Sequence, residues 1–222
     1  MKFNRTFFKK TYYRTFYPNL RSGKRIIHEF KIKRLLNLIH DSIFPYDKFK
    51  ISKPVKTFIV LGMHRSATSM ISRALHLSQE VWMGDDLYLG GESNPRGHFE
   101  LIPVINLNNE ILNEAGGSWD NPPMPSSIRE LKGKFDNRMK KIILDLEKTA
   151  GKGSIGIKDP RMCLTIELWE PFFKNPHYIV TYRSTSQIAK SLTQRNGMTI
   201  EKAVKLTNEY NKRIMQFISS RY

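Results

Sequence analysis

The sequence is poor in cysteine. Cys163 is the only one among 222 residues. A single thiol cannot form a disulfide within the chain, and it cannot build a cysteine cluster for a metal. This cysteine usage favours a reducing compartment over a secreted one.

Long apolar runs are also missing. No stretch approaches the roughly 18 consecutive apolar residues of a membrane span. Near the N-terminus, Lys9, Lys10 and Arg14 interrupt the apolar residues, so we expect no hydrophobic signal core. These features together predict a cytoplasmic location, with peripheral membrane contact left open.

Acidic residues are few relative to basic ones. The chain has 37 Lys and Arg against 20 Asp and Glu, a net charge of +17, whereas its hydrophobic fraction of 40% is ordinary for a globular protein. Such an excess calls for an anionic partner: nucleic acid, an anionic membrane surface, or a phosphorylated or sulfated small molecule. Residues 1–50 alone hold 13 of the basic residues and 3 acidic ones.

The length suits one well-buried domain with an appendage. We place the appendage at residues 1–54 and the domain at 55–222. Residues 1–24 interleave aromatic with basic residues, a pattern that fits stacking on bases, a membrane interface, or docking on the domain itself. Residues 25–44 predict an amphipathic basic helix that lies on an anionic membrane or on its own domain. A linker follows at residues 45–54. We expect no specific nucleic acid as a partner of the protein.

The chain is organised around the stretch 57–75. An apolar run, 58–61, ends at Gly62, and a loop of small and polar residues leads into an apolar-periodic segment that begins at Ser69. This is strand, tight loop and helix, in which backbone N–H groups converge on one point that suits a phosphate or sulfate. Arg65 adds a charged fork of donors, and hydroxyls come from Ser66, Thr68 and Ser69.

Further strands and helices alternate along the chain. Short strands are predicted at 80–83, 154–157 and 178–182, and helices at 102–112, 127–150, 185–197 and 200–218. Residues 115–127, rich in proline and glycine, predict a long loop of the kind that serves as a lid or a substrate wall. The alternation predicts an α/β fold with a mostly parallel sheet and ligands at the carboxyl ends of the strands.

Three polar clusters fall at those predicted strand ends. They are the loop 62–69, the segment 158–161 (K-D-P-R), and Arg183 with Ser191. Lys158 can reach the same anion as the loop, while Arg183 offers a planar fork for a second phosphate. Two anion sites that lie a nucleoside's length apart would fit a nucleotide with phosphates at both ends.

The loop is close to a Walker A motif but departs from it twice. Ala67 stands where the second glycine belongs, and Thr68 stands where the lysine belongs. Without that lysine the β- and γ-phosphates lose their usual counter-charge. A P-loop kinase or nucleotide-binding protein is therefore the disfavoured alternative. A membrane-associated binding module without activity is another.

On these residues the chain resembles the sulfotransferase family, over roughly residues 55–215. The loop G-M-H-R-S-A-T-S resembles the family's 5′-phosphosulfate loop, in the form with arginine where the cytosolic members have lysine. Arg183 and Ser191 match the pair that grips the 3′-phosphate of the donor, and Lys158 matches the strand-end lysine at the transferring group. The segments N-P-R-G-H-F-E and K-D-P-R are similar to those of bacterial members.

The resemblance implies a fold, a reaction and a set of site residues. The fold is the three-layer α/β sandwich of P-loop type, and the donor is 3′-phosphoadenosine 5′-phosphosulfate (PAPS). The acceptor is a hydroxyl of a carbohydrate or other small metabolite, and no metal is needed. The donor-binding residues are Gly62, Met63, His64, Arg65, Ser66, Ala67, Thr68, Ser69, Arg183 and Ser191.

Sulfuryl transfer also needs cations at the reacting group and a base for the acceptor hydroxyl. Arg65 and Lys158 are the expected cations. Glu100 is the preferred base, with Asp159, Glu92 and Asp86 as alternatives, and His64 is disfavoured because it lies within the donor loop.

The chain departs from the family in two ways. The family usually has glycine at the position of Ala67, so a methyl group meets the donor where close backbone approach is expected. Family domains usually continue with another strand and a loop over the adenine nucleotide, so we expect this chain to be shorter at its C-terminus. Both departures bear on activity.

Overall fold

The structure, a computed structural model, describes residues 55–88, 97–151 and 153–221. The predicted appendage at 1–54, with its basic helix and its proposed membrane contact, lies outside the described residues. So do Glu92 and most of the loop before His98. None of the described helices has the length and apolar character needed to cross a membrane.

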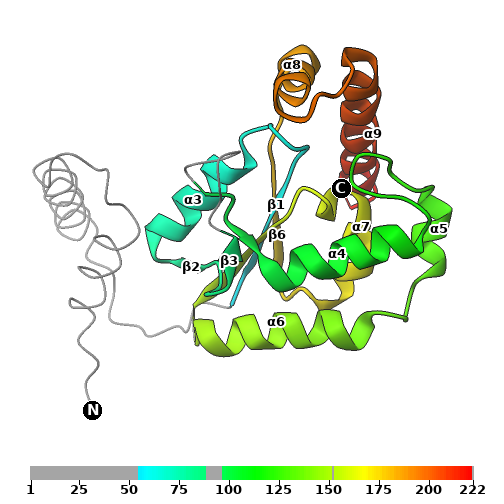
Figure 1. The fold of residues 1–222 in the computed structure, drawn as a ribbon. Coiled ribbons are helices and arrows are strands. Elements are labelled where there is room, and N and C mark those ends of the chain that lie inside the picture. Colours follow the sequence, from blue (N-terminus) through cyan, green and yellow to red (C-terminus); the bar gives the residue numbers. More distant parts are fainter. Residues whose placement is uncertain (1–54, 89–96, 152, 222) are drawn as a thin grey trace, which may run out of the picture. The chain divides into compact units, whose positions relative to one another are not determined.

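A parallel sheet of four strands forms the centre of the fold (Figure 1). Its strands, in spatial order, are β2 (Val81–Trp82), β5 (Ser154–Lys158), β1 (Thr57–Leu61) and β6 (Pro176–Val180). All three pairings are parallel, and the register sets Val60 of β1 opposite Lys158 and Leu61 opposite Val180. The carboxyl ends of β1, β5 and β6 therefore meet at one edge, as predicted for an α/β protein.

Burial distinguishes the inner strands β1 and β5 from the edge strand β6. Ile59, Val60 and Leu61 are fully buried, as expected for a strand covered on both faces. On β5, Gly156 lets β2 and the following residues come close, because a Cβ there would lie 2.3 Å from the sulfur of Met83. β6, at the edge of the sheet, is only half-buried.

Helices surround this sheet. In chain order they are α3 (Thr68–Ser78), α4 (Ile102–Glu114), α5 (Pro125–Glu130), α6 (Asp136–Ala150), α7 (Met162–Trp169), the 3₁₀ turn η1 (Glu170–Phe172), α8 (Thr185–Asn196) and α9 (Ile200–Ser219). α3 contacts β1, β2 and β5, while α7 packs against α4, α5 and α9. Figure 1 shows α3 to the left of the sheet and α7 and α9 to its right, an arrangement compatible with three layers.

Two predictions around the long loop were wrong. The loop ends at Met124, because Pro125 begins α5 at the first helical position, where its missing N–H costs no hydrogen bond. The helix predicted at 127–150 is two helices, α5 and α6. Gly133, with φ of +89°, stands in the turn between them, in a conformation that few other residues adopt.

Two strand predictions also need correction. The strand predicted at 178–182 is β6, and it begins and ends two residues earlier. Pro176 is its first residue and lies in an edge strand, where a proline is tolerated. A two-stranded antiparallel ribbon of β3 (Leu87–Tyr88) and β4 (Glu100–Leu101) was not predicted. Strands of two residues carry too little periodicity to be recognised from sequence.

Candidate functional site

The loop after β1 is held tightly at Gly62. A Cβ at this position would lie 2.0 Å from the Thr181 Oγ1 and 2.7 Å from the Ser66 Oγ, so only glycine fits. The Ser66 hydroxyl donates to the Met63 carbonyl at 2.7 Å and lies 2.9 Å from the Thr181 hydroxyl. Ser66 and Met63, both predicted to bind the donor, are buried supports of the loop.

The end of the loop takes a left-handed backbone conformation. Arg65 and Ala67 both have φ of +71°, which costs a non-glycine residue about 1–2 kcal/mol. Ala67 is the N-cap of α3 and supplies no side-chain cap, and the first turn of α3 carries no acidic residue. The N-terminus of α3, which begins at Thr68, therefore keeps the positive end of its dipole for an external anion.

Two residues predicted from distant parts of the chain meet at this loop. The Arg65 guanidinium donates through Nε to the Ser191 Oγ at 2.8 Å. Arg183 donates to the Arg65 carbonyl at 3.0 Å and to Gln187 Oε1 at 3.0 Å. The loop and the β6–α8 segment are thus joined. Arg183 lines the pocket described below, whereas the Ser191 hydroxyl is occupied by Arg65.

Lys158 extends from the end of β5 to the same loop. Its ammonium group donates to Glu100 Oε1 at 2.5 Å, to the His98 carbonyl at 3.0 Å and to the Ser69 Oγ at 3.2 Å. The Lys158 side chain is 1% exposed and that of Glu100 is 6% exposed. Burial lowers the pKa of Lys158 and raises the pKa of Glu100, although each charge stabilises the other.

The alternative bases are less well placed. The Asp159 carboxylate accepts hydrogen bonds from the Arg161 backbone N–H, the Arg161 guanidinium and the Asn108 amide. It is fully buried and does not line the pocket. Asp86 is exposed and also lies outside the pocket. Of the predicted carboxylates that the structure describes, Glu100 is the one that lines the pocket.

Two histidines of the pocket have lowered pKa values. Burial, reinforced by the charges of Arg161 and Lys158, holds the pKa of His64 well below its usual value. Burial and the charge of Lys158 lower the pKa of His98 to about 4. The His64 ring packs on Trp119, with ring centroids 4.7 Å apart, and its Nε2 is buried with no hydrogen-bond partner among the described residues.

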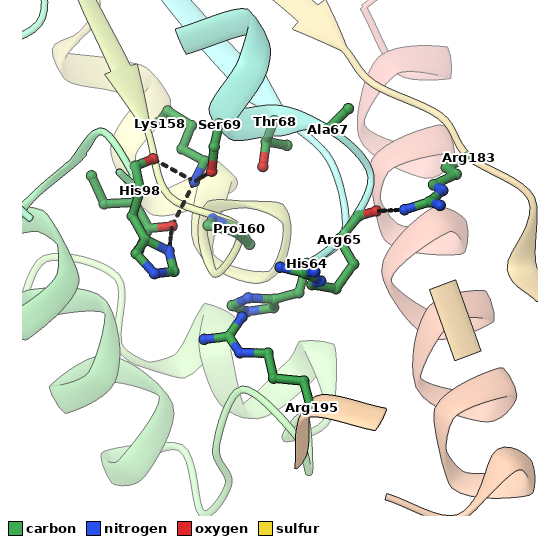
Figure 2. Close-up of a pocket in the computed structure, with 11 residues that line it drawn as sticks. His64, Arg65, Ala67, Thr68, Ser69, His98, Lys158, Pro160, Arg183 and Arg195 are labelled. Atoms are coloured by element: carbon green, nitrogen blue, oxygen red, sulfur yellow. Dashed lines mark hydrogen bonds and ion pairs between the residues drawn. The ribbon is translucent and has the colours of Figure 1, made fainter. Parts of the chain in front are cut away.

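These groups enclose a pocket of about 270 Å³ at the carboxyl edge of the sheet (Figure 2). Among the described residues, four cations and one carboxylate line it, together with two histidines, two hydroxyls and two small apolar residues: Arg65, Lys158, Arg183, Arg195, Glu100, His64, His98, Thr68, Ser69, Ala67 and Pro160. The excess of positive charge and the uncapped helix suit a multiply charged anion.

Sequence reasoning missed Arg195 and His98. Arg195 follows Ser191 by four residues on α8, and this spacing places two side chains on one face of a helix. That spacing could have identified it. His98 is positioned by the β3–β4 ribbon, which the sequence did not reveal, and its backbone carbonyl rather than its ring contacts Lys158.

The loop predicted as a substrate wall lies against the pocket through Trp119. Helix α9 holds it at three points. The Tyr210 hydroxyl donates to the Trp119 carbonyl at 2.8 Å, Arg213 donates to the Pro123 carbonyl at 2.5 Å, and Lys202 pairs with Asp120 at 2.8 Å. Trp119 is therefore fixed behind the His64 ring.

Within the described ranges, no group of three or more His, Cys, Asp or Glu side chains is placed to hold a metal ion. Comparison of the chain with family models, with curated proteins and with solved structures finds no match.

Proposed function

We propose that this domain is a sulfotransferase that moves a sulfuryl group from PAPS to a hydroxyl of a carbohydrate or other small metabolite. One observation carries the proposal. Arg65 of the loop bonds to Ser191, and Arg183 bonds to the Arg65 carbonyl, so the two predicted anion sites form one continuous surface. With this function we also propose that the α/β fold is the three-layer sandwich of P-loop type.

The residues present fit such a donor. The loop 62–69 and the uncapped start of α3 would hold its 5′ end, and Arg183 would hold its 3′-phosphate. When Arg65 turns from the Ser191 hydroxyl to the donor, Ser191 joins Arg183 at the 3′-phosphate. Ala67 already occupies the left-handed conformation that its glycine counterpart would adopt, so its methyl does not prevent the loop from forming.

The donor supplies an activated sulfuryl group. In the transfer, the acceptor oxygen forms a bond to sulfur while the bond from sulfur to the 5′-phosphate oxygen breaks. Arg65 and Lys158 stabilise the negative charge that develops on the leaving oxygen. Glu100, whose pKa is raised by burial, takes the proton of the acceptor hydroxyl.

Binding of adenosine 3′,5′-bisphosphate, measured by titration calorimetry, tests this function. Arg65→Ala and Arg183→Ala should each weaken binding about 10- to 100-fold, because each removes a charge-assisted contact of about 1.5–3 kcal/mol. Arg129→Ala is the matched control, since Arg129 is an exposed arginine outside the pocket.

The same titration with ATP and Mg²⁺ separates the proposal from a P-loop kinase. Tighter binding of ATP than of the bisphosphate nucleotide would contradict the proposal. Equal binding of the bisphosphate nucleotide to the wild type, Arg65→Ala and Arg183→Ala proteins would also contradict it.

A further inference from the structure

The four cations of the pocket differ in what they contact. Lys158 has three hydrogen-bond partners, Arg183 has two, and Arg65 has the Ser191 hydroxyl. Arg195 lines the same pocket, yet its guanidinium makes no hydrogen bond or ion pair with any residue that the structure describes. It is therefore the cation most available to a ligand.

The charge of Arg195 acts inside the pocket. Burial is the largest cause of the lowered pKa values of His64, Arg65 and His98, and the charge of Arg195 lowers each of them further. Like charges held this close repel one another, and a bound anion relieves that repulsion. Figure 2 shows the Arg195 side chain extending from α8 toward the His64 ring, away from Lys158 and Ser69.

His64 supplies a second polar group at this place. Its Nε2 is buried and has no partner among the described residues, although a buried polar atom usually has one. The ring is held from behind by Trp119 and, at 6.1 Å, by Tyr210. In the tautomer that carries its proton on Nε2, this atom can donate to an anionic oxygen placed beside Arg195.

From this arrangement we infer that Arg195 and the Nε2 edge of His64 form an anion subsite of their own, which binds an acidic group on the acceptor. The inference rests on the proposed function in one respect, because the donor engages the other three cations. The acceptor then carries a carboxylate or a sulfate or phosphate ester beside its reacting hydroxyl, as an acidic carbohydrate does.

Inorganic sulfate probes the subsite directly. In the presence of saturating adenosine 3′,5′-bisphosphate, sulfate should still bind the full chain. Arg195→Gln should weaken that binding about tenfold or more while leaving nucleotide binding within about twofold, since one charge-assisted contact is lost. Lys190→Gln is the matched control, because Lys190 is an exposed cation on the same helix outside the pocket.

A pair of disaccharides tests the acceptor class. One contains a uronate, and the other is the same sugar with its carboxylate reduced to an alcohol. The uronate form should bind the nucleotide complex about tenfold more tightly, and Arg195→Gln should abolish the difference. Equal binding of both forms, or binding of neither, would overturn the assignment of an acidic acceptor.

Other outcomes separate the subsite from the proposed function. Loss of nucleotide binding in Arg195→Gln would overturn the inference and place Arg195 in the donor site. Unchanged sulfate binding in this variant would overturn it as well. If the nucleotide does not bind the wild type, the proposed function fails, whereas sulfate binding that depends on Arg195 in the absence of nucleotide would still support the subsite.

Discussion

The two sides of the pocket hold their cations in different ways. On one side, Lys158 is buried and pairs with the buried carboxylate of Glu100. On the other, Arg183 is exposed and Arg65 is partly exposed, and their partners are a hydroxyl, a backbone carbonyl and an amide oxygen. We call the side of Lys158 and Glu100 the closed side, because an ion pair holds it. We call the side of Arg65 and Arg183 the open side, because neutral acceptors hold it.

This difference separates stability from binding. A buried charge that loses its partner is costly, so Lys158 cannot leave Glu100 without a large penalty. An arginine that exchanges a neutral hydrogen-bond acceptor for an anionic ligand gains free energy, because hydrogen bonds between two charged groups are stronger. We therefore expect the closed side to determine folding and the open side to determine affinity.

The largest effect is expected from Glu100→Ala on the closed side. Among the described residues, it leaves the buried Lys158 ammonium with the His98 carbonyl and the Ser69 hydroxyl as its hydrogen-bond partners. The free energy of unfolding should fall by about 3–5 kcal/mol, measured by urea denaturation. Glu201→Ala removes one partner of the exposed pair with Lys205 and should change stability little. Equal effects of the two variants would show that the closed side is not stabilising.

A smaller effect on the same side concerns pH. The pKa of His98 is about 4 in the folded chain and about 6.5 when unfolded, so the unfolded chain binds an extra proton between these values. Stability should therefore rise with pH across this window and fall on acidification. His98→Gln should reduce the rise of the melting temperature between pH 4 and 7. The contribution of His64, which has the same sign, and that of Glu100, which opposes it, remain in both proteins. Identical pH profiles would contradict this assignment.

The smallest effect on stability is expected at Ala67 on the open side. Ala67→Gly removes the left-handed strain of about 1–2 kcal/mol, but it adds freedom to the unfolded chain worth about 0.4–1 kcal/mol. Stability should change by no more than about 1 kcal/mol, while affinity for the bisphosphate nucleotide rises. Ala74→Gly, at an exposed position within α3, should cost about 1 kcal/mol without affecting binding. Weaker nucleotide binding in Ala67→Gly would contradict this expectation.

The sequence predicted the parts of the molecule that repeat over several residues. β1, β5 and the helices α4 and α9 carry apolar patterns long enough to be recognised, and their alternation gave the parallel sheet. The placement of Lys158 and Arg183 at strand ends followed from that sheet. Their approach to the loop is a consequence of parallel strands sharing one edge.

What the sequence could not reveal depends on contacts between distant segments. Nothing in its pattern shows that Arg65 selects Ser191 as a partner, or that Glu100 rather than Asp159 pairs with Lys158. The β3–β4 ribbon brings Glu100 into place, and it is too short to leave a periodic signal.

The contact between Arg65 and Ser191 spans 126 residues of chain. β1 pairs only with strands that come much later in the sequence, so the sheet closes through long crossovers, which are slow to form. The loop after β1 is thus among the first parts of the domain to be synthesised, whereas its partners Arg183 and Ser191 are among the later parts. Binding of an anion to the complete pocket therefore reports that the whole domain, rather than one segment of it, has folded.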